Sequence, residues 1–255
     1  MELLIILILV IIFFACLMQA VFGFGSALFS MPLLAIVIPL EEAGPIVAIS
    51  ATFLAIIAVI PVRKQIQIKS VRWLLLGSVV GIPIGVFLLK QLSLQPKEIK
   101  LSEENIFGFL LGILIISFSI YQLRKRNNFE LKSNIFAVPT GIFAGVLGGL
   151  INTTGPPIVV YGVLKRWDPI QFRASLQAYF MFSAFYISIN HGYQGLWTSS
   201  VLQVTGYAIP VAILAVVVGQ FINNKISTDK FTHLVYFLLI AIGVIFCGKS
   251  ISYFI

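Results

Sequence analysis

One short stretch of the chain combines residue types that can hold an anion. Its sequence is Asn152-Thr153-Thr154-Gly155-Pro156-Pro157. Threonine suits the cap position before a helix and proline suits the first helical turn, so the stretch predicts a helix start. The first amides of a helix have no acceptors inside it, and together with the helix dipole they bind anions. We therefore expect backbone N–H groups near Thr153, Thr154 and Gly155 to bind an anion, with Asn152 orienting it.

A second interruption lies in the first half of the chain. Gly23-Phe24-Gly25-Ser26 precedes a short apolar segment that contains Pro32, just as Gly148 and Gly149 precede the stretch described above. We expect the amides at Gly25 and Ser26 to form a poorer copy of the same site. The alternative is a pair of helix kinks without a ligand, because glycine and proline are frequent in membrane helices.

A basic residue near the start of a later apolar segment could supply charge. Arg173 stands three residues inside the segment 170–190. Its guanidinium could bind an oxyanion through two parallel hydrogen bonds. Gln177 lies one turn further on the same helix face, Ser175 lies between them, and Ser50 has the matching position in the first half. We expect Ser50, Ser175 and Gln177 to help orient the anion. The alternative for Arg173 is an arginine that snorkels to the membrane interface.

Other chemistries lack the residues that they would need. No Asp or Glu lies in the middle of an apolar segment, so a carboxylate proton relay of the common kind is not expected. His191 and His233 are single and far apart, and Cys16 and Cys247 lie in apolar runs without metal-ligand spacing. No HExxH, nucleophile elbow or phosphate-binding loop is present. We expect no metal, no cofactor and no enzyme activity, and any coupled proton would travel on the substrate as a protonated weak acid.

The composition places these residues in a membrane. Apolar residues make up 59% of the 255 and charged residues only 10%, whereas soluble domains have about 25% charged residues. Runs such as 3–14 and 234–246 are apolar throughout and do not alternate as barrel strands would. The fold class that follows is an all-α polytopic membrane protein, and the first apolar run is expected to be a retained span. The net charge of +8 comes from short loops, so we expect no nucleic-acid partner.

Ten apolar segments can be distinguished. They run at about 3–22, 26–39, 43–61, 72–92, 104–123, 134–151, 155–165, 170–190, 198–222 and 231–250. A straight span needs roughly 20 residues, so 26–39 and 155–165 are too short to cross alone. Each short segment follows one of the two interruptions, which predicts paired broken or re-entrant helices near the midplane.

The basic residues predict the orientation. Cytoplasmic loops are enriched in Lys and Arg, and one of the two orientations places 13 of the 17 basic residues inside. Both termini then lie on the outer, periplasmic side of a bacterial inner membrane. This topology makes the second half inverted relative to the first. The predicted organisation is a first repeat at 1–126, a cytoplasmic linker at 127–133 and an inverted second repeat at 134–255.

The repeat rests on the pattern of segments more than on residue identity. Sliding the halves by 125 residues superposes Gly23 on Gly148 and Pro32 on Pro157, but few other residues match. Inverted repeats with paired broken helices are typical of secondary transporters, whose sites lie where the repeats meet. Gly77, Gly81 and Gly85, at four-residue spacing, predict close packing against another helix.

The chain resembles the sulfite exporter (TauE/SafE) family of bacterial permeases. The resemblance rests on the Gly23-to-Leu33 stretch, its counterpart from Gly148 to Pro157, and the Arg173-Ala174-Ser175 entry to a later segment. It implies an inner-membrane protein with duplicated halves that moves sulfite, sulfonates or related small anions. Relatives often have more glycine in the first interruption, where this chain has Ala27-Leu28-Phe29, which argues against equal anion binding by the first half.

The function that we expect is secondary transport of a small anion by alternating access. Its partners are a small anionic substrate and the lipid bilayer, and the sequence leaves assembly into a homo-oligomer open. An anion channel would use the same helix-dipole site without a conformational cycle. A membrane scaffold or an intramembrane enzyme is a more distant alternative. The substrate, the direction of transport and any coupling ion are not determined by the sequence.

Overall fold

The computed structural model describes residues 2–94, 109–110, 112–117, 119–121, 123–124, 131–223, 237, 240–241, 243–244 and 247–248. The chain divides into two compact units, Met1–Lys90 with Phe129–Lys225 and Gln91–Asn128 with Ile226–Ile255. The predicted segments 104–123 and 231–250 belong to the second unit, and each is described only in part. Each unit contains parts of both predicted halves, so the repeat boundaries at 126 and 134 stay a prediction.

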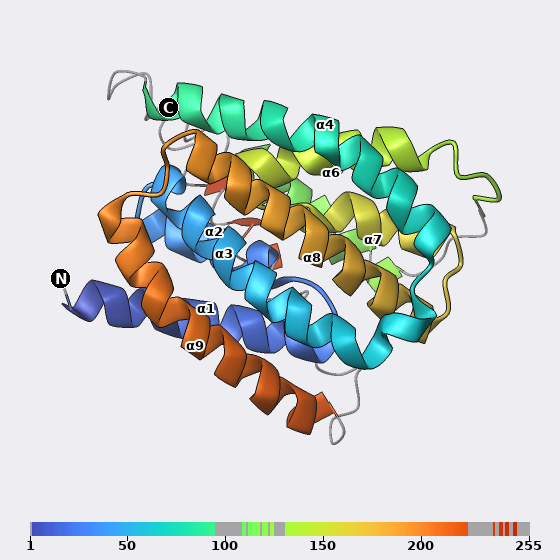
Figure 1. Cartoon of the computed structure of the whole chain (residues 1–255), viewed down its shortest axis with the longest axis horizontal. Coiled ribbons are helices and arrows are strands. Elements are labelled where there is room, and N and C mark those ends of the chain that lie inside the picture. The colour runs from blue at the N-terminus through green and yellow to red at the C-terminus, as the bar shows by residue number, and fades with distance from the viewer. Residues whose placement is uncertain are drawn as a thin grey trace. The chain divides into compact units, whose positions relative to one another are not determined.

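The described elements of the first unit are all helices (Figure 1). They are α1 (Glu2–Phe22), α2 (Ser26–Val37), α3 (Leu40–Val59), the short 3-10 helix η1 (Ile60–Gln65), α4 (Ile68–Ser93), α6 (Ala137–Ile151), α7 (Gly155–Leu164), α8 (Pro169–Tyr193) and α9 (Ser199–Asn223). The all-helical fold class is thus confirmed for the described residues. The two short predicted segments correspond to α2, with 12 residues, and α7, with 10.

Four of the described helical stretches are long and apolar enough to cross a membrane. They are Glu2–Val21, Leu40–Gln65, Ile68–Ser93 and Ser199–Gly219. Large apolar side chains also remain exposed along these helices, among them Phe14, Phe53, Phe87 and Phe221. A water-soluble monomer rarely exposes so much apolar surface, whereas lipid tails would cover it favourably. These side chains are the surface that we expect to contact the bilayer.

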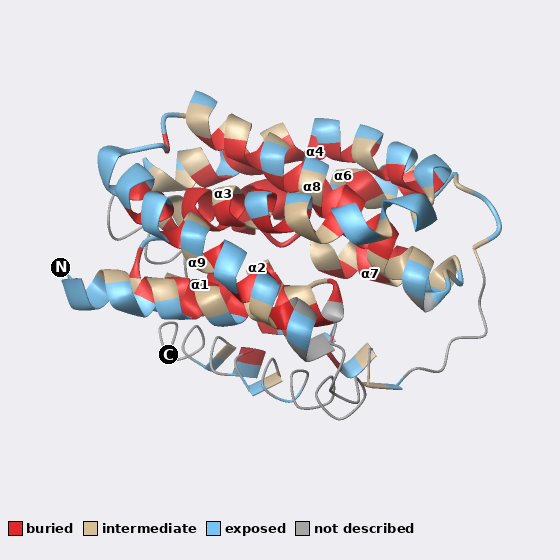
Figure 2. Cartoon of the chain, turned by 60° about the horizontal axis from the view of Figure 1, so that its bottom comes forward, coloured by how far each residue is buried: buried red, intermediate tan, exposed pale blue. Residues whose placement is uncertain are grey.

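The interior of this unit is built around α3 and α8. Figure 2 shows the buried residues of both helices as stripes that face inward. Every residue from Ala174 to Phe180 is buried, although α8 contains more polar residues than the four stretches above. The start of α3 at Gly44 lies against His191 near the end of α8, and the Gln67 amide after η1 donates to Ser175 Oγ at 2.9 Å. The two helices therefore run antiparallel.

Glycines allow α4 and α6 to approach closely, as the four-residue spacing predicted. A Cβ on Gly77, Gly81 or Gly85 would collide with the α6 carbonyls of Val138, Ile142 or Val146. Gly141 and Gly149 of α6 are in turn held against the carbonyls of Leu74 and Ile82. This packing fixes α6, whose last turn leads into the second interruption.

Both ends of the α6–α7 pair lie at the same end of the unit. The Leu131 amide, before α6, donates to the Leu164 carbonyl at the end of α7 at 2.8 Å. Lys165 Nζ donates to the Lys132 carbonyl at 3.2 Å, and the Tyr161 hydroxyl to Asn134 Oδ1 at 3.2 Å. The interruption between α6 and α7 is therefore the far tip of a helical hairpin.

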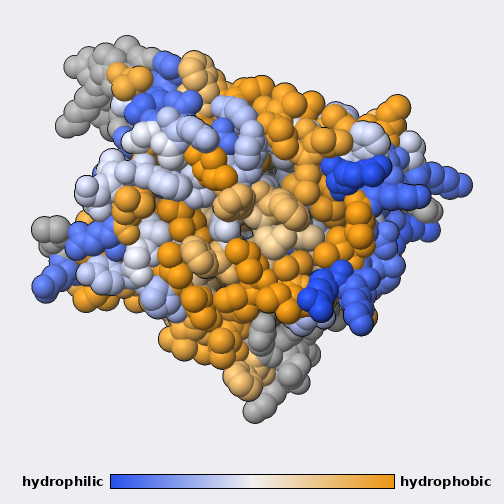
Figure 3. All heavy atoms as spheres, in the orientation of Figure 1, coloured by the Kyte–Doolittle hydropathy of each residue, from blue (hydrophilic) through white to orange (hydrophobic). Residues whose placement is uncertain are grey.

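Basic residues gather at this same end. They are Arg63 and Lys64 in η1 and Lys132, Lys165 and Arg166 in the loops. Figure 3 shows the deep blue basic residues at the right-hand edge, beside an orange apolar band. The loop at the other end of α8, residues 190–199, contains neither Lys nor Arg. The charge asymmetry used for the predicted orientation is thus present between the two ends of the unit.

Candidate functional site

The first interruption depends on glycine backbone geometry. Gly23 and Gly25 have φ angles of +86° and +107°, a region that side chains with a Cβ rarely adopt. The Gly23 amide closes α1 by donating to the Gln19 carbonyl at 2.8 Å. The first helical bond of α2 runs from the Phe29 amide to the Gly25 carbonyl at 3.0 Å. A helix that begins in this way leaves the amides of its first turn, at residues 26–28, without acceptors inside the helix.

A chain of buried side-chain hydrogen bonds holds this interruption against α8. Gln177 Nε2 donates to the Gly23 carbonyl at 2.9 Å, and Gln19 Nε2 donates to Gln177 Oε1 at 3.3 Å. The Ser26 hydroxyl donates to Gln19 Oε1. Gln19, Ser26 and Gln177 are each at most 5% exposed. Each of these hydrogen bonds orients the side-chain amide that makes the next one. The start of α2 is therefore held in place by α8.

The second interruption ends α6 with an asparagine in the left-handed conformation. Asn152 has φ 56° and ψ 12°, which asparagine tolerates better than most residues. Its amide donates to the Gly148 carbonyl at 2.8 Å, and the Thr153 amide donates to the Leu147 carbonyl at 3.3 Å. The first of these bonds, from an amide in the left-handed conformation to the carbonyl four residues back, is one that commonly terminates helices. The Asn152 side chain also donates to the Gly44 carbonyl of α3 at 2.6 Å.

The start of α7 offers fewer donors than its sequence suggested. Thr154 occupies the cap position, but its side chain makes no capping bond, and Pro156 and Pro157 have no amide hydrogen. The Thr153 amide is used by α6, and its hydroxyl donates to the Ile151 carbonyl at 3.1 Å. The donors left for a ligand are the amides of Thr154 and Gly155 and the Thr154 hydroxyl.

Close packing at Gly148 brings Thr154 back over the end of α6. A Cβ on Gly148 would collide with Thr154 Cγ2 and lie 3.0 Å from Ile187 Cδ1. Gly149 is held against α4, and Pro32 lies buried inside α2. Of the predicted break residues, Gly23 lies in an interruption, Gly148 and Gly149 form the last turn of α6, and Pro156 and Pro157 the first turn of α7.

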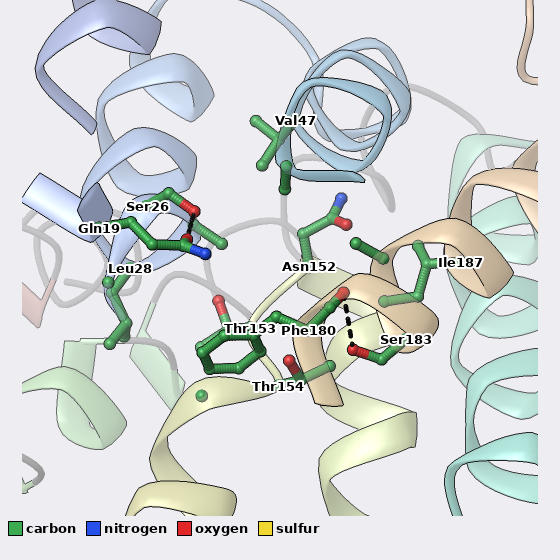
Figure 4. Close-up of a pocket in the computed structure, with 15 residues that line it drawn as sticks. Gln19, Ser26, Leu28, Val47, Asn152, Thr153, Thr154, Phe180, Ser183 and Ile187 are labelled. Atoms are coloured by element: carbon green, nitrogen blue, oxygen red, sulfur yellow. Dashed lines mark hydrogen bonds between the residues drawn. The ribbon is translucent and has the colours of Figure 1, made fainter. Parts of the chain in front are cut away.

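The two interruptions line one pocket (Figure 4). Figure 4 shows Gln19 and Ser26 on one side and Thr153 and Thr154 on another. The lining residues are Gln19, Gly25, Ser26, Ala27, Leu28, Val47, Ala51, Asn152, Thr153, Thr154, Gly155, Phe180, Ser183, Ala184 and Ile187. They come from α1, from both interruptions with the helices α2 and α7 that follow, and from α3 and α8. None of them is a charged residue, so backbone dipoles and neutral polar groups define the chemistry of the pocket.

Four predicted residues do not line this pocket. Ser50 Oγ donates to the Ile46 carbonyl of its own helix at 2.7 Å, and Ser175 accepts from the Gln67 amide. Gln177 lies behind the pocket and binds Gly23. Arg173 is half-buried, and a Cβ on Gly23 would lie 3.2 Å from its Cγ. Arg173 and Gln177 therefore share the predicted helix face, and that face meets the first interruption.

Some lining residues were absent from the sequence analysis. Gln19 gave a usable signal, because it is a lone polar residue within the long apolar run of α1 and such residues mark polar sites in membranes. Ser183 also lines the pocket, with its hydroxyl donated to the Phe180 carbonyl at 3.4 Å. Phe180, Ala184 and Ile187 resemble ordinary core residues in sequence, and only the packing of α8 places them here.

Comparison with known proteins adds independent information. A sequence model of the family described as "Sulfite exporter TauE/SafE" matches residues 8–246 of the chain. A protein of Cupriavidus necator named "Probable sulfite/organosulfonate exporter TauE" is 23% identical over 191 residues, which cover 74% of this chain and 72% of that protein. No solved structure matches the chain.

Proposed function

The chain belongs to the sulfite exporter TauE/SafE family of membrane transporters, and we propose that it moves sulfite or a small organosulfonate through the pocket between the two helix interruptions. The observation that supports this proposal most directly is the shared lining of the pocket. Residues 25–28 and 152–155 lie far apart in sequence and face the same space. A helix start contributes about half a positive charge, so two of them directed at one point favour an anion.

The proposed ligands are mainly backbone groups. The amides at residues 26–28 form one donor set, and those of Thr154 and Gly155 form the other, with the Thr154 hydroxyl beside them. The Asn152 side chain orients the anion from the edge of the pocket. We do not include Ser50 and Ser175 among the ligands of the anion in this conformation, because their hydroxyl groups already have partners outside the pocket.

The size of the pocket favours a small oxyanion in this conformation. Its volume is about 40 Å³ on a scale on which one water needs roughly 10–15 Å³. Sulfite, with four heavy atoms, is comparable to a few waters. An organosulfonate has a longer organic part, and its passage requires the apolar side formed by Leu28, Phe180 and Ile187 to open.

Arg173 is proposed as an entrance residue. It precedes the pocket residue Phe180 on α8 by about two turns, roughly 10 Å, in the direction of the basic loops. A guanidinium at that position raises the local concentration of anions without fixing them in the pocket. Gln177, between Arg173 and Phe180, is proposed as a support for the first interruption.

We propose that α1–α2 and α6–α7 are the paired broken or re-entrant helices of two inverted repeats. In support, each pair is followed by a long helix, α3 or α8, and these two helices run antiparallel. The α6–α7 hairpin has its ends among the basic loops, which the positive-inside rule places in the cytoplasm of a bacterial inner membrane. Alternating access would then consist of one pair moving against the other around the anion.

Substitution of Thr154 tests the site directly. Thr154→Val keeps the shape of the side chain and removes its hydroxyl, and the loss of one such hydrogen bond corresponds to about 1 kcal/mol, or roughly fivefold in apparent affinity. The measurement is uptake of labelled sulfite into proteoliposomes against sulfite concentration. The matched control is Thr205→Val, because Thr205 is a buried α9 threonine bonded to its own helix and does not line the pocket. Equal affinities in both variants would contradict the assignment of Thr154, and no saturable uptake by the unmodified protein would contradict the proposed function.

A further inference from the structure

A buried histidine beside the pocket has no hydrogen-bond partner. His191 is 0% exposed, and neither ring nitrogen has a partner that completes a hydrogen bond. Among the described residues, its nitrogens are the only buried side-chain nitrogen or oxygen atoms in this condition. Leaving a buried polar group unpaired typically costs about 1–3 kcal/mol, so such a group needs an explanation. A group that is unpaired at rest can be paired in another state of the transport cycle.

The position of His191 links it to the anion site. Ser183 and Ile187 of α8 line the pocket, and His191 follows Ile187 by one helical turn, so it continues their face of the helix just beyond the pocket. A Cβ placed on Gly44 would lie 3.3 Å from His191 Cε1 and 3.3 Å from Asn152 Nδ2. The imidazole and the Asn152 amide therefore meet at the same glycine of α3. Figure 4 shows Asn152 and Ile187 together at one edge of the pocket.

We propose that His191 is the proton-binding residue of the transport site and that it takes up a proton when the anion binds. This inference rests on the proposed function, and it places the coupled proton on the protein and not on the substrate. A histidine can exchange protons between about pH 5 and pH 8. The protonated ring could donate hydrogen bonds from both of its nitrogens. The two nitrogens would then be unpaired only while the anion is absent.

The charge of the pocket gives the physical reason. No Lys or Arg lines the pocket, and an anion transferred from water into a site of low dielectric constant is unfavourable unless positive charge accompanies it. Two helix starts supply only part of that charge. A proton on His191 supplies the remainder close to the anion. By reciprocity, the anion must strengthen proton binding as much as the proton strengthens anion binding.

The elements around His191 contain few competing titratable groups. α3 has Glu41 and Glu42 in its first turn, α4 has Lys90 in its last turn, and α6 has no titratable residue. On α8 itself, Tyr186 and Tyr193 are the titratable side chains nearest in sequence, and α9 has Tyr207. None of these groups has a hydrogen bond to the His191 ring in the described part of the chain. His191 is thus the titratable side chain adjacent to the pocket whose charge a bound anion could change.

The first arm of the test measures proton uptake by the purified, unmodified protein. The probe is methanesulfonate, because a sulfonate stays ionised throughout the range and any proton must then bind to the protein. Binding is measured by isothermal titration calorimetry, and proton uptake by a pH indicator in weak buffer, near pH 7. We expect up to about one proton taken up per anion bound. Anion binding without proton uptake overturns this inference and leaves the proposed function standing, whereas no binding of methanesulfonate or sulfite overturns both.

The second arm assigns the proton. We expect the affinity of the unmodified protein to fall by between about 5- and 150-fold as the pH rises through the titration range, which is the usual span of coupling between two ligands. His191→Gln removes this dependence, and His233→Gln, the same change at the other histidine of the chain, retains it. Equal pH dependence in both variants overturns the assignment to His191. If His191→Gln does not fold, His191→Asn takes its place, and proton uptake by the unmodified protein still decides whether a proton is coupled.

Discussion

Single backbone positions determine where the two interruptions lie. Gly25 has a φ angle of +107°, and a Cβ added there would meet no atom within 4 Å. Glycine is therefore required at this position by backbone conformation and not by lack of space. Asn152 has the equivalent role at the end of α6, where its left-handed conformation is combined with a side-chain bond to the Gly44 carbonyl. The pocket is thus bordered by two residues whose backbone geometry few residue types can adopt.

Alanine substitution at Gly25 tests this requirement. The left-handed conformation costs a residue with a Cβ about 1–2 kcal/mol, so we expect Gly25→Ala to lower the unfolding temperature in detergent and to weaken anion binding. Gly206→Ala is the control, because Gly206 lies within helix α9 and also has no atom within 4 Å of an added Cβ. There, alanine should leave stability unchanged or raise it by up to about 1 kcal/mol. Equal behaviour of the two variants would show that the backbone at Gly25 is not strained by alanine.

The sequence predicted the second interruption better than the first. Asn152, Thr153 and Thr154 are polar residues between apolar runs, and a proline pair follows them, so their position was visible without a structure. The sequence did not show that the Thr153 amide, one of the expected donors, already donates to the Leu147 carbonyl of α6. Gln177 lies on the same helix face as Arg173, as predicted. The sequence did not show what this face contacts, because that depends on the packing of α8 against the Gly23 carbonyl. Local patterns therefore indicated the polar residues, and tertiary packing decided which of them reach the pocket.

Whole helices position the interruptions through close contacts. α6 is fixed to α4 by glycines on both helices, and α8 is fixed to the first interruption by Gln177. The four-residue glycine spacing of α4 was readable in the sequence, because small residues at that spacing permit close approach. Its partner was not readable, since Gly141, Gly145 and Gly149 in α6 could have faced any neighbour. The short length of α2 and α7 was also predicted correctly, because an interruption followed by proline limits a helix at its start.

The α4–α6 contact predicts a strong effect of one added carbon. A Cβ on Gly81 would collide with the Ile142 backbone carbonyl, which has no flexible side chain to move away. We expect Gly81→Ala to cost about 1–3 kcal/mol, as overpacking of a close contact usually does. The measurement is the yield of monodisperse protein together with its unfolding temperature. Val80→Leu adds one carbon at a neighbouring position that is 55% exposed, and it should be tolerated. An unfolding temperature for Gly81→Ala equal to that of Val80→Leu would contradict the close contact.

Across the two ends of the described helices, the separation of charge is the basis of the proposed orientation. The short helix η1 and the loop that joins α7 to α8 contain lysine and arginine, whereas residues 190–199 contain none. Composition and charge predict a topology without a structure, because both act over entire loops and do not depend on packing, and this topology stays a prediction. The inverted relation between the halves remains a proposal that the antiparallel α3 and α8 support.

Cysteine labelling tests the orientation. Tyr193 is 87% exposed at the end of α8, and Lys132 is exposed in the loop before α6. In a variant without Cys16 and Cys247, we expect Tyr193→Cys to react with a membrane-impermeant thiol reagent in intact cells. Lys132→Cys should react only after the membrane is permeabilised. The reverse pattern would place the basic loops outside and contradict the proposed topology.

In the proposed mechanism, the two interruptions enclose one anion site that opens to either side of the membrane. The most direct measurement is the rate at which a cysteine at Ala184, which lines the pocket, reacts with a membrane-impermeant thiol reagent in right-side-out and inside-out vesicles. We expect the cysteine to react from both sides, and we expect methanesulfonate to slow the reaction in each case in the concentration range that inhibits sulfite transport. A reaction rate unchanged by saturating methanesulfonate, in protein that still transports sulfite, would contradict the account.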